Sequence, residues 1–354
     1  MIRRRPCASS RQLYGKEVHT AVQCVSAYLF DWLENKTPNL ERSTAEAYRV
    51  YIGKHLAPFF DKLGKPLEEL RPMDVQRYAT EKLNGGRCDG KDGGMSRVSV
   101  RKHLNVLKQA FSDAVLYDII PQSPALHVKL PRVATISKDV QFLSIAQSQT
   151  LLAAFEGTFQ TMVLVALYYG LRRSEVLGLR WSAIDFTEDT LTISHTVVKN
   201  FTIECKDRTK TASSRRCFML FPDVRQALLE LRERQQAERA ARIAEGKSYT
   251  ENDYLFRYPD GRLFRPDYVT RAFERTARKC TLAQIRFHDL RHSTASILFE
   301  RGWNVKDVQA WLGHSDVQTT LDIYVHYTRA RKRLIGKDFA GTLTAPAISK
   351  VVEA

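Results

Sequence analysis

Residues 288–327, HDLRHSTASILFERGWNVKDVQAWLGHSDVQTTLDIYVHY, contain the patterns that decide the fold of the second half of this chain. Within them, Val305, Val308 and Leu312 recur at helical spacing. Gly313 follows directly, and a glycine after the last periodic residue is typical of a helix end. We therefore expect helices here, separated by short motifs of polar residues: HDLRH, LGH and TTLDIYVHY.

The N-terminal part of the chain is also helical in pattern. Ser43 and Glu46 have the spacing of a capping box, and Pro72 is expected in the first turn of a later helix. The stretches with apolar residues at helical spacing lie at about 22–32, 43–51, 72–83 and 100–115. Together they predict a compact helical bundle over residues 18–125.

A second domain is expected after a change of composition. Prolines and basic residues near 126–140 indicate an extended linker. Beyond it, residues 141–340 again follow helical patterns, including a long helix at 223–247. Residues 190–220 instead alternate with a period of two, which predicts a small antiparallel sheet. The fold class expected is mainly α with a small antiparallel β-sheet (α+β).

The net charge indicates a polyanionic partner. The chain has 354 residues, 27% of them charged, and a formal net charge of +16. Lysine and arginine that neutralise phosphates release counterions and so favour binding to nucleic acid. A basic enzyme with another substrate remains an alternative on charge alone.

The length of the chain predicts two domains, because it exceeds the size at which one core usually keeps growing, about 250 to 300 residues.

Several other classes are disfavoured by composition. The six cysteines form no C-x-x-C pair and no Cys/His group, so we expect reduced thiols in a cytoplasmic protein and no structural zinc. The basic residues 1–17 are followed by no apolar segment of a secretory signal. The longest apolar run, MVLVALYY at 162–169, is too short to span a bilayer.

Tyr324 is the expected nucleophile of a reaction on DNA. Attack on a phosphodiester without a metal ion needs a nucleophile, cations near the non-bridging oxygens and an acid for the leaving oxygen. A free tyrosine has a pKa of about 10 and needs nearby positive charge or a base to react. The chain has 14 tyrosines, and an isolated one more often serves packing. Tyr327, one helical turn later, is an alternative that spacing leaves open.

Arg172 and Arg291 are expected to bind the phosphate, because planar guanidinium groups spread charge-assisted hydrogen bonds over its oxygens. Glu175 lies three residues after Arg172 and is expected to hold its guanidinium, although Arg-x-x-Glu alone is usually a surface ion pair. His288 lies three residues before Arg291 and is expected to assist proton movement at the tyrosine. His292 is expected to be structural.

His314 and Lys210 complete the expected site. His314 follows a helix end, where a histidine can simply interact with the helix dipole. We interpret it as a third hydrogen-bond donor to the phosphate. Lys210 is expected at a hairpin turn, from which its ammonium enters the minor groove and gives a proton to the 5′ leaving oxygen. A lysine in a loop is more often only solvated. The chain shows no acidic triad for two Mg²⁺ ions and no P-loop.

The motifs GLRRSE, TKTASSRR, HDLRH, LGH and TTLDIYVHY together resemble those of the tyrosine recombinases, the phage integrase family. The resemblance covers roughly residues 18–335. It implies a core-binding DNA-binding domain at 18–125 and a catalytic domain at 141–340. The family pattern is filled here by Arg172, Lys210, His288, Arg291, His314 and Tyr324.

The resemblance implies a site-specific DNA recombinase, or integrase, that works through a 3′-phosphotyrosyl intermediate. Expected partners are double-stranded DNA with attachment or crossover sites, three further copies of the chain in a homo-tetramer, and accessory excision or DNA-bending proteins. No cofactor or metal is expected. The spacing in TTLDIYVHY favours an integrase that integrates and excises a mobile element.

Other functions remain open from sequence. One is a recombinase that resolves chromosome dimers, and another is a type IB topoisomerase or related strand transferase. A DNA-binding regulator without catalysis is disfavoured by the complete residue set. Basic residues 1–17 either bind a phosphate backbone or stay disordered, and the tail 341–354 either docks on a neighbouring protomer or frays.

Overall fold

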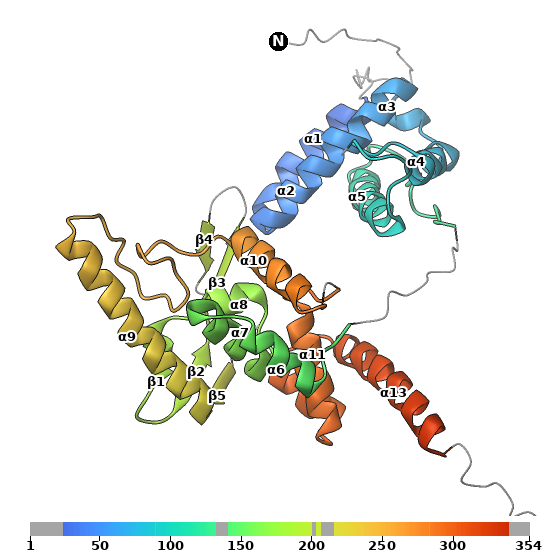
Figure 1. The fold of residues 1–354 in the computed structure, drawn as a ribbon. Coiled ribbons are helices and arrows are strands. Elements are labelled where there is room, and N and C mark those ends of the chain that lie inside the picture. The colour runs from blue at the N-terminus through green and yellow to red at the C-terminus, as the bar shows by residue number, and fades with distance from the viewer. Residues whose placement is uncertain are drawn as a thin grey trace, which may run out of the picture. The chain divides into compact units, whose positions relative to one another are not determined.

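The computed structural model describes residues 24–88, 90–131, 141–199, 203–206, 216–282 and 284–339. The predictions for residues 1–17, for Lys210, for the tail 341–354 and for most of the linker lie outside these residues. The chain divides into two compact units, Met1–Ile136 and Ser137–Ala354 (Figure 1).

The first unit consists of helices, as the apolar spacing predicts. Its longer helices are α1 (Val25–Lys36), α2 (Arg42–Tyr51), α3 (Ala57–Leu63), α4 (Pro72–Asn84) and α5 (Arg97–Leu116). A single π-helical turn, Ile52–Leu56, joins α2 to α3. The helices predicted near 22–32, 43–51, 72–83 and 100–115 are therefore confirmed.

The helix starts in this unit follow local chemistry, with one correction. Pro72 opens α4 as predicted, and the Asp74 carboxylate accepts a hydrogen bond from the backbone of Arg71. The capping box predicted at Ser43 is wrong. Helix α2 begins at Arg42, two residues before the start that a cap at Ser43 implies. The Glu41 carbonyl accepts from the backbone of the first turn, and Ser43 lies inside the helix.

The core of the first unit is aromatic and aliphatic. Leu29, Phe60, Tyr78 and Phe111 are each at most 2% exposed. The Tyr78 hydroxyl lies 2.7 Å from Nδ1 of buried His103, so the polar group of this core tyrosine is satisfied. Burial of this apolar surface stabilises the bundle.

The second unit combines helices with short strands. Its helices are α6 (Ile145–Ala153), α7 (Gly157–Tyr169), α8 (Arg173–Leu177), α9 (Pro222–Ala244), α10 (Pro266–Lys279), α11 (Asp289–Glu300), α12 (Val305–Leu312) and α13 (Val317–Phe339). Its strands are β1 (Ile184–Asp185), β2 (Thr190–Ile193), β3 (Thr196–Lys199), β4 (Ile203–Lys206) and β5 (Arg216–Met219). The mainly helical fold class is confirmed.

The strands form two sheets where sequence alone indicated one. Strands β1, β2 and β5 make a three-stranded antiparallel sheet, whereas β3 and β4 pair only with each other. The alternating stretch LTISHTVV breaks between β2 and β3, because its two halves pair with different partners. Strand β4 ends at Lys206 and β5 begins at Arg216 in the other sheet, and the predicted turn at Lys210 lies between them, outside the described residues.

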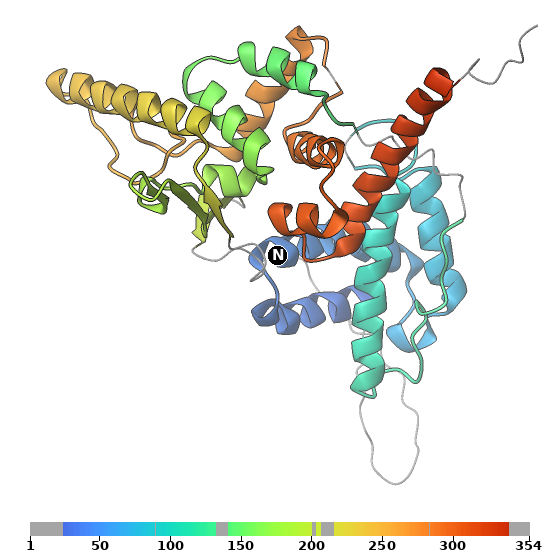
Figure 2. The same ribbon diagram turned by 90° about the horizontal axis from the view of Figure 1, so that it is seen from below.

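Helices pack beside the three-stranded sheet and beside one another. The long helix predicted at 223–247 is observed as α9, which contacts α7 and lies beside this sheet (Figures 1 and 2). On the other side of α7, helices α11, α12 and α13 contact one another. A small apolar cluster of Ala295, Phe299, Val308, Leu312 and Ile323 holds these three helices together. Among the described helices, none is both long and apolar enough to cross a membrane.

Candidate functional site

Arg291 lies at the centre of the polar residues of the second unit. It stands in the first turn of α11 and is 1% exposed. Its Nη1 donates to the Gly170 carbonyl at 2.7 Å, its Nη2 to the Leu312 carbonyl at 2.6 Å, and its Nε to Nε2 of His314 at 3.1 Å. Burial and the nearby Arg172 lower the pKa of Arg291 to about 9, so its guanidinium stays charged at neutral pH.

Gly170 makes the approach of α7 to this site possible. It ends α7 with φ of +59°, a left-handed conformation that glycine adopts without strain. A Cβ atom at this position would lie 2.3 Å from the Leu312 side chain and 3.3 Å from that of Thr294. Glycine therefore lets the end of α7 pack against α11 and α12, where its carbonyl reaches Arg291.

Glu175 supplies the one carboxylate among these arginines. Its side chain is 2% exposed and forms an ion pair with Nη1 of Arg172 at 2.7 Å, as the Arg-x-x-Glu spacing predicts. Its other oxygen accepts from the Arg172 backbone at 2.8 Å and from Nη2 of Arg216 at 2.9 Å. Arg291 lies slightly further away, with its Nη1 at 3.9 Å. The carboxylate thus holds arginines from three separate segments in one place.

Arg216 is a member of this group that sequence reasoning missed. It is the first residue of β5, and its Nη1 donates to the Trp311 carbonyl at 2.7 Å. Burial lowers its pKa, which the Glu175 carboxylate partly offsets. The alternation in the strand RCFM could have revealed it, because it places Arg216 on the same inward face as Phe218. An arginine on an inward face usually has a charged partner.

His314 accepts a hydrogen bond from an arginine. It follows the end of α12 at Gly313, whose left-handed conformation confirms the predicted helix end. Its Nε2 faces the Arg291 Nε–H, and its Nδ1 lies 2.8 Å from Oγ1 of Thr320. Burial and the charges of Arg291 and Arg172 lower the pKa of His314 to about 3. The imidazole is therefore neutral at physiological pH.

His288 and His292 lie beside the arginines at the start of α11. His288 is the residue just before the helix, and its ring meets that of His292 edge to face at 5.1 Å. Burial, followed by the charge of Arg291, lowers the pKa of His288. Burial lowers the pKa of His292 to about 4, and its buried Nδ1 has no hydrogen-bond partner among the described residues. Neutral forms are favoured at both positions.

Tyr324 stands on α13 and is less buried than these residues. It is 38% exposed, and its ring meets Phe299 edge to face at 5.1 Å. Its hydroxyl forms no hydrogen bond with any of the described residues. Tyr327 is partly buried in the apolar cluster with its ring 5.9 Å from Phe299. The exposed hydroxyl makes Tyr324 the better placed of the two tyrosines to meet a substrate.

The structure thus brings together most of the residues expected at the site. We call Arg172, Glu175, Arg216, Arg291 and His314 the arginine cluster. His288 lies next to this cluster, and Tyr324 stands on an adjoining helix without a direct bond to it. Lys210 falls outside the described residues, so its predicted place is untested.

The chemistry of the arginine cluster fits a phosphate. Three guanidinium groups and one carboxylate leave two net positive charges in a buried setting. Planar guanidinium groups form paired charge-assisted hydrogen bonds with phosphate oxygens. In the described ranges, no three His, Cys, Asp or Glu side chains are grouped in a way that holds a metal ion.

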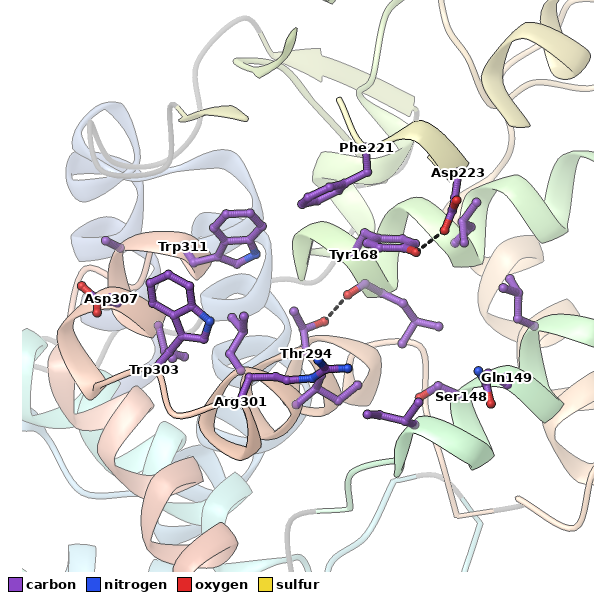
Figure 3. Close-up of a pocket in the computed structure, with 18 residues that line it drawn as sticks. Ser148, Gln149, Tyr168, Phe221, Asp223, Thr294, Arg301, Trp303, Asp307 and Trp311 are labelled. Atoms are coloured by element: carbon purple, nitrogen blue, oxygen red, sulfur yellow. Dashed lines mark hydrogen bonds between the residues drawn. The ribbon is translucent and has the colours of Figure 1, made fainter. Parts of the chain in front are cut away.

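A separate apolar pocket lies behind the site. It has a volume of about 950 Å³ and is lined by Tyr168, Phe221, Trp303 and Trp311 together with aliphatic side chains (Figure 3). The Tyr168 hydroxyl donates to Asp223 at 2.6 Å at its edge (Figure 3). No guanidinium of the arginine cluster lines this pocket. Its lining contains one arginine, Arg301, and two carboxylates, Asp223 and Asp307, so it offers no net positive charge to a phosphate.

Comparisons with known proteins agree with this geometry. Residues 141–331 match the profile of the Phage integrase family, and residues 25–83 that of the Phage integrase, N-terminal SAM-like domain. The ICEBs1 integrase of Bacillus subtilis is 26% identical over 88% of this chain and 81% of the relative. The transposase from transposon Tn916 of Enterococcus faecalis is 25% identical over 92% of this chain and 82% of the relative.

A solved structure supports the fold. The Tn1549 transposon integrase, in complex with a circular intermediate DNA, superposes with a TM-score of 0.67. The two sequences are 20% identical, and the match covers 88% of this chain and 99% of that one. Similarity at this level of identity concerns the fold.

Proposed function

This chain belongs to the phage integrase family, and from that premise we propose that Tyr324 and the arginine cluster form its site of DNA cleavage and rejoining. It is a site-specific recombinase of the tyrosine type, an enzyme that cuts and rejoins DNA strands. The assignment of individual residues to steps of this reaction is our proposal.

The observation that carries the proposal is the charge of the arginine cluster. Arg216, Arg291 and Glu175 are buried and Arg172 is partly exposed, so the two net positive charges lie largely out of water, where electrostatic interactions are stronger. A phosphodiester has one negative charge, and the pentacoordinate transition state has more charge on its non-bridging oxygens. Positive groups fixed before the reaction stabilise that added charge without reorganisation. Arg172 and Arg291 are the members that contact the phosphate.

The reaction uses Tyr324 as the nucleophile. Its oxygen attacks the scissile phosphorus, the bond from phosphorus to the 5′ oxygen breaks, and a 3′-phosphotyrosyl ester forms. The tyrosine proton passes to neutral His288, whose lowered pKa keeps a lone pair available. Lys210 gives a proton to the departing 5′ oxygen. Rejoining reverses these steps. No external energy source is consumed, because the phosphotyrosyl ester keeps much of the energy of the phosphodiester bond that it replaced.

The biological reaction is the integration and excision of a mobile element. The names of the relatives support this: the ICEBs1 integrase, the transposase from transposon Tn916 and an integrase of Staphylococcus phage L54a, which is 24% identical. Double-stranded DNA with attachment sites is the substrate, and a homo-tetramer in the cytoplasm, aided by accessory excision or DNA-bending proteins, is the working form. The domain bounds are 18–125 for DNA core binding, 126–140 for the linker and 141–340 for catalysis.

A second function within the family has specific support. Relatives named a XerC-like tyrosine recombinase of Caldanaerobacter subterraneus and a tyrosine recombinase of Thermosipho africanus are 24% and 26% identical. Resolution of chromosome dimers is therefore the alternative. The two functions differ in whether recombination joins two different attachment sites or two copies of one chromosomal site, which a two-plasmid assay with sequences flanking the gene distinguishes.

A nicked suicide duplex tests the chemistry. The nick lets the short strand diffuse away after cleavage, so the covalent complex accumulates and survives denaturation. We expect wild-type chain and Tyr327→Phe to form the adduct, and Tyr324→Phe to bind the same DNA without forming it. An adduct that persists in Tyr324→Phe and disappears in Tyr327→Phe would overturn the assignment.

A further inference from the structure

The hydrogen bonds of His314 define which ring nitrogen carries its proton. A guanidinium has only donors, so the Arg291 Nε–H requires an unprotonated Nε2 on His314. The proton of the neutral ring is then on Nδ1, which lies 2.8 Å from Oγ1 of Thr320. The Thr320 hydroxyl accepts this hydrogen bond. The low pKa of His314 agrees with a neutral ring.

Thr320 belongs to the helix of the nucleophile. It lies in the first turn of α13 and is 0% exposed. Tyr324 follows four residues later, and residues at this spacing lie on the same face of a helix. One buried hydroxyl therefore connects the helix of Tyr324, through His314, to Arg291.

We propose that Thr320 is a positioning residue of the recombination site, whose hydroxyl fixes the His314 proton on Nδ1 and so couples the placement of the Tyr324 helix to the orientation of Arg291. This inference rests on the proposed function of the site. Without the hydroxyl, the Nδ1–H is buried without a partner, which favours a proton on Nε2. That proton faces the Arg291 Nε–H, and two donors in contact displace the guanidinium.

A hydroxyl suits this position because it can reverse its role. While Nε2 accepts from Arg291, the Thr320 oxygen accepts from Nδ1. If the ring loses its Nδ1 proton to solvent and takes one on Nε2, the Thr320 hydroxyl donates to Nδ1 and the net charge of the ring is unchanged. Nε2 then becomes a donor to the phosphate, the role that the sequence predicts for His314, in a state in which the Arg291 Nε–H has turned from the ring to the phosphate. Thr320 therefore supports both the DNA-free and the phosphate-bound arrangement.

Two substitutions separate the hydroxyl from the shape of the side chain. Thr320→Val removes the hydroxyl and keeps the branched shape, whereas Thr320→Ser keeps the hydroxyl and removes the methyl group. Each full-length variant is compared with wild type in three measurements: affinity for the duplex, the single-turnover rate of covalent adduct formation on the suicide duplex, and ¹⁵N NMR of the histidine rings in the absence of DNA. The His314 signals are assigned with His314→Gln.

We expect Thr320→Val to slow adduct formation by about 10- to 100-fold, the range that a buried unsatisfied donor implies, with duplex affinity within about twofold. Thr320→Ser is expected to remain within about threefold of wild type, because its hydroxyl still satisfies Nδ1. In the spectrum, wild type and Thr320→Ser have a protonated Nδ1 and an unprotonated Nε2 on His314, and Thr320→Val loses this pattern.

Three results would overturn the inference. The first is an unchanged cleavage rate in Thr320→Val. The second is a slower rate with the wild-type proton pattern on His314, which indicates that the threonine only packs the helix. The third is a full additional loss when Thr320→Val is combined with His314→Gln, since residues that act through one another are not additive.

The controls keep these results interpretable. Should Thr320→Val fail to bind the duplex, Thr320→Ala, which leaves a space instead of a methyl group, is judged by the same criteria. If wild type forms no adduct, the proposed function fails, while the NMR measurement still reports on the Thr320–His314 bond. The two failures are therefore distinguishable.

Discussion

The arginine cluster and the nucleophile differ in how firmly the protein fixes them. Arg291 is 1% exposed, and its guanidinium has three partners supplied by α7, α12 and His314. Tyr324 is 38% exposed on α13, which α11 and α12 hold through a small apolar cluster. The phosphate-binding groups are thus fixed before DNA arrives, while the attacking hydroxyl belongs to a partly exposed side chain on a helix that packs against α11 and α12.

This difference indicates that the two parts serve separate requirements. Stabilisation of charge benefits from groups that need no reorganisation during the reaction. Delivery of the nucleophile instead needs a hydroxyl that DNA can reach, and the 38% exposure of Tyr324 meets that need. Substitutions of the arginines that contact the phosphate should therefore slow adduct formation strongly. Substitutions of residues around them should slow it less.

The largest effect is expected from Arg291→Lys. Lysine keeps the charge but cannot reach the Gly170 carbonyl, the Leu312 carbonyl and His314 in one plane. We expect adduct formation on the suicide duplex to fall by about 10³-fold, the upper range for removal of a preorganised donor. The free energy of unfolding should fall by about 1–3 kcal/mol because buried acceptors lose partners, measured by chemical denaturation.

A neutral phosphate provides the control for this variant. A methylphosphonate at the scissile position lacks one negative charge, so it needs less stabilisation by arginine. The ratio of wild-type to Arg291→Lys rates should be smaller on this duplex than on the natural one. Equal ratios on both duplexes would indicate that Arg291 acts only in folding.

A smaller effect is expected from Arg172→Lys, with the neighbouring arginine as a matched control. Arg172 is partly exposed and pairs with Glu175, so one face of its guanidinium is open to a substrate. We expect a loss of about 10²-fold in adduct formation. Arg173 instead bonds to Pro266 and Thr270 of α10, and Arg173→Lys should cleave within about threefold of wild type. Equal losses in both would contradict the assignment.

Arg216 should act on the site through Glu175. Arg216→Met removes the 2.9 Å bond to the carboxylate and lets Glu175 draw Arg291, now at 3.9 Å, away from the phosphate. We expect a loss of about 10-fold in adduct formation, the scale of one buried charged hydrogen bond. Duplex affinity measured by fluorescence anisotropy should change little. A variant that loses affinity and cleavage in parallel would place Arg216 in DNA binding instead.

The smallest effect concerns pH. The folded-state pKa of His292 is about 4, below the ordinary value near 6.5, so the unfolded chain binds more protons between these values. Stability is therefore complete above about pH 6.5 and falls as the pH is lowered towards 4, by at most about 1.4 kcal/mol per pH unit for this group. Urea denaturation at pH 7.5 and 5 should show this fall.

His292→Gln isolates the contribution of that ring. Glutamine does not titrate, so the dependence of stability on pH should become shallower than in wild type. An identical slope would indicate that His292 is not neutral and buried in solution.

Local patterns predicted much of this molecule. The helix end at Gly313, the start of α4 at Pro72 and the pairing of Arg172 with Glu175 all depend on residues within a few positions of one another. Such features follow from spacing and from the conformational preferences of single residues. The sequence was sufficient for them.

Contacts between distant segments were beyond those patterns. The bond from Arg216 to Glu175 and that from Thr320 to His314 depend on where β5 and α13 pack. The division of the strands into two sheets likewise depends on which partner each strand meets, and period-two alternation does not specify it. The capping box predicted at Ser43 was wrong, because Glu41 is the residue that precedes the first turn of α2.

The proposed mechanism requires that one tyrosine hydroxyl becomes esterified to the cut strand at the arginine cluster. It is tested most directly by trapping the adduct on a suicide duplex, digesting it with nuclease and protease, and locating the linked nucleotide by mass spectrometry. We expect a 3′-phosphotyrosyl bond on the peptide that contains Tyr324, at that residue. A bond at Tyr327 or at any other residue, or a 5′ linkage, would contradict it.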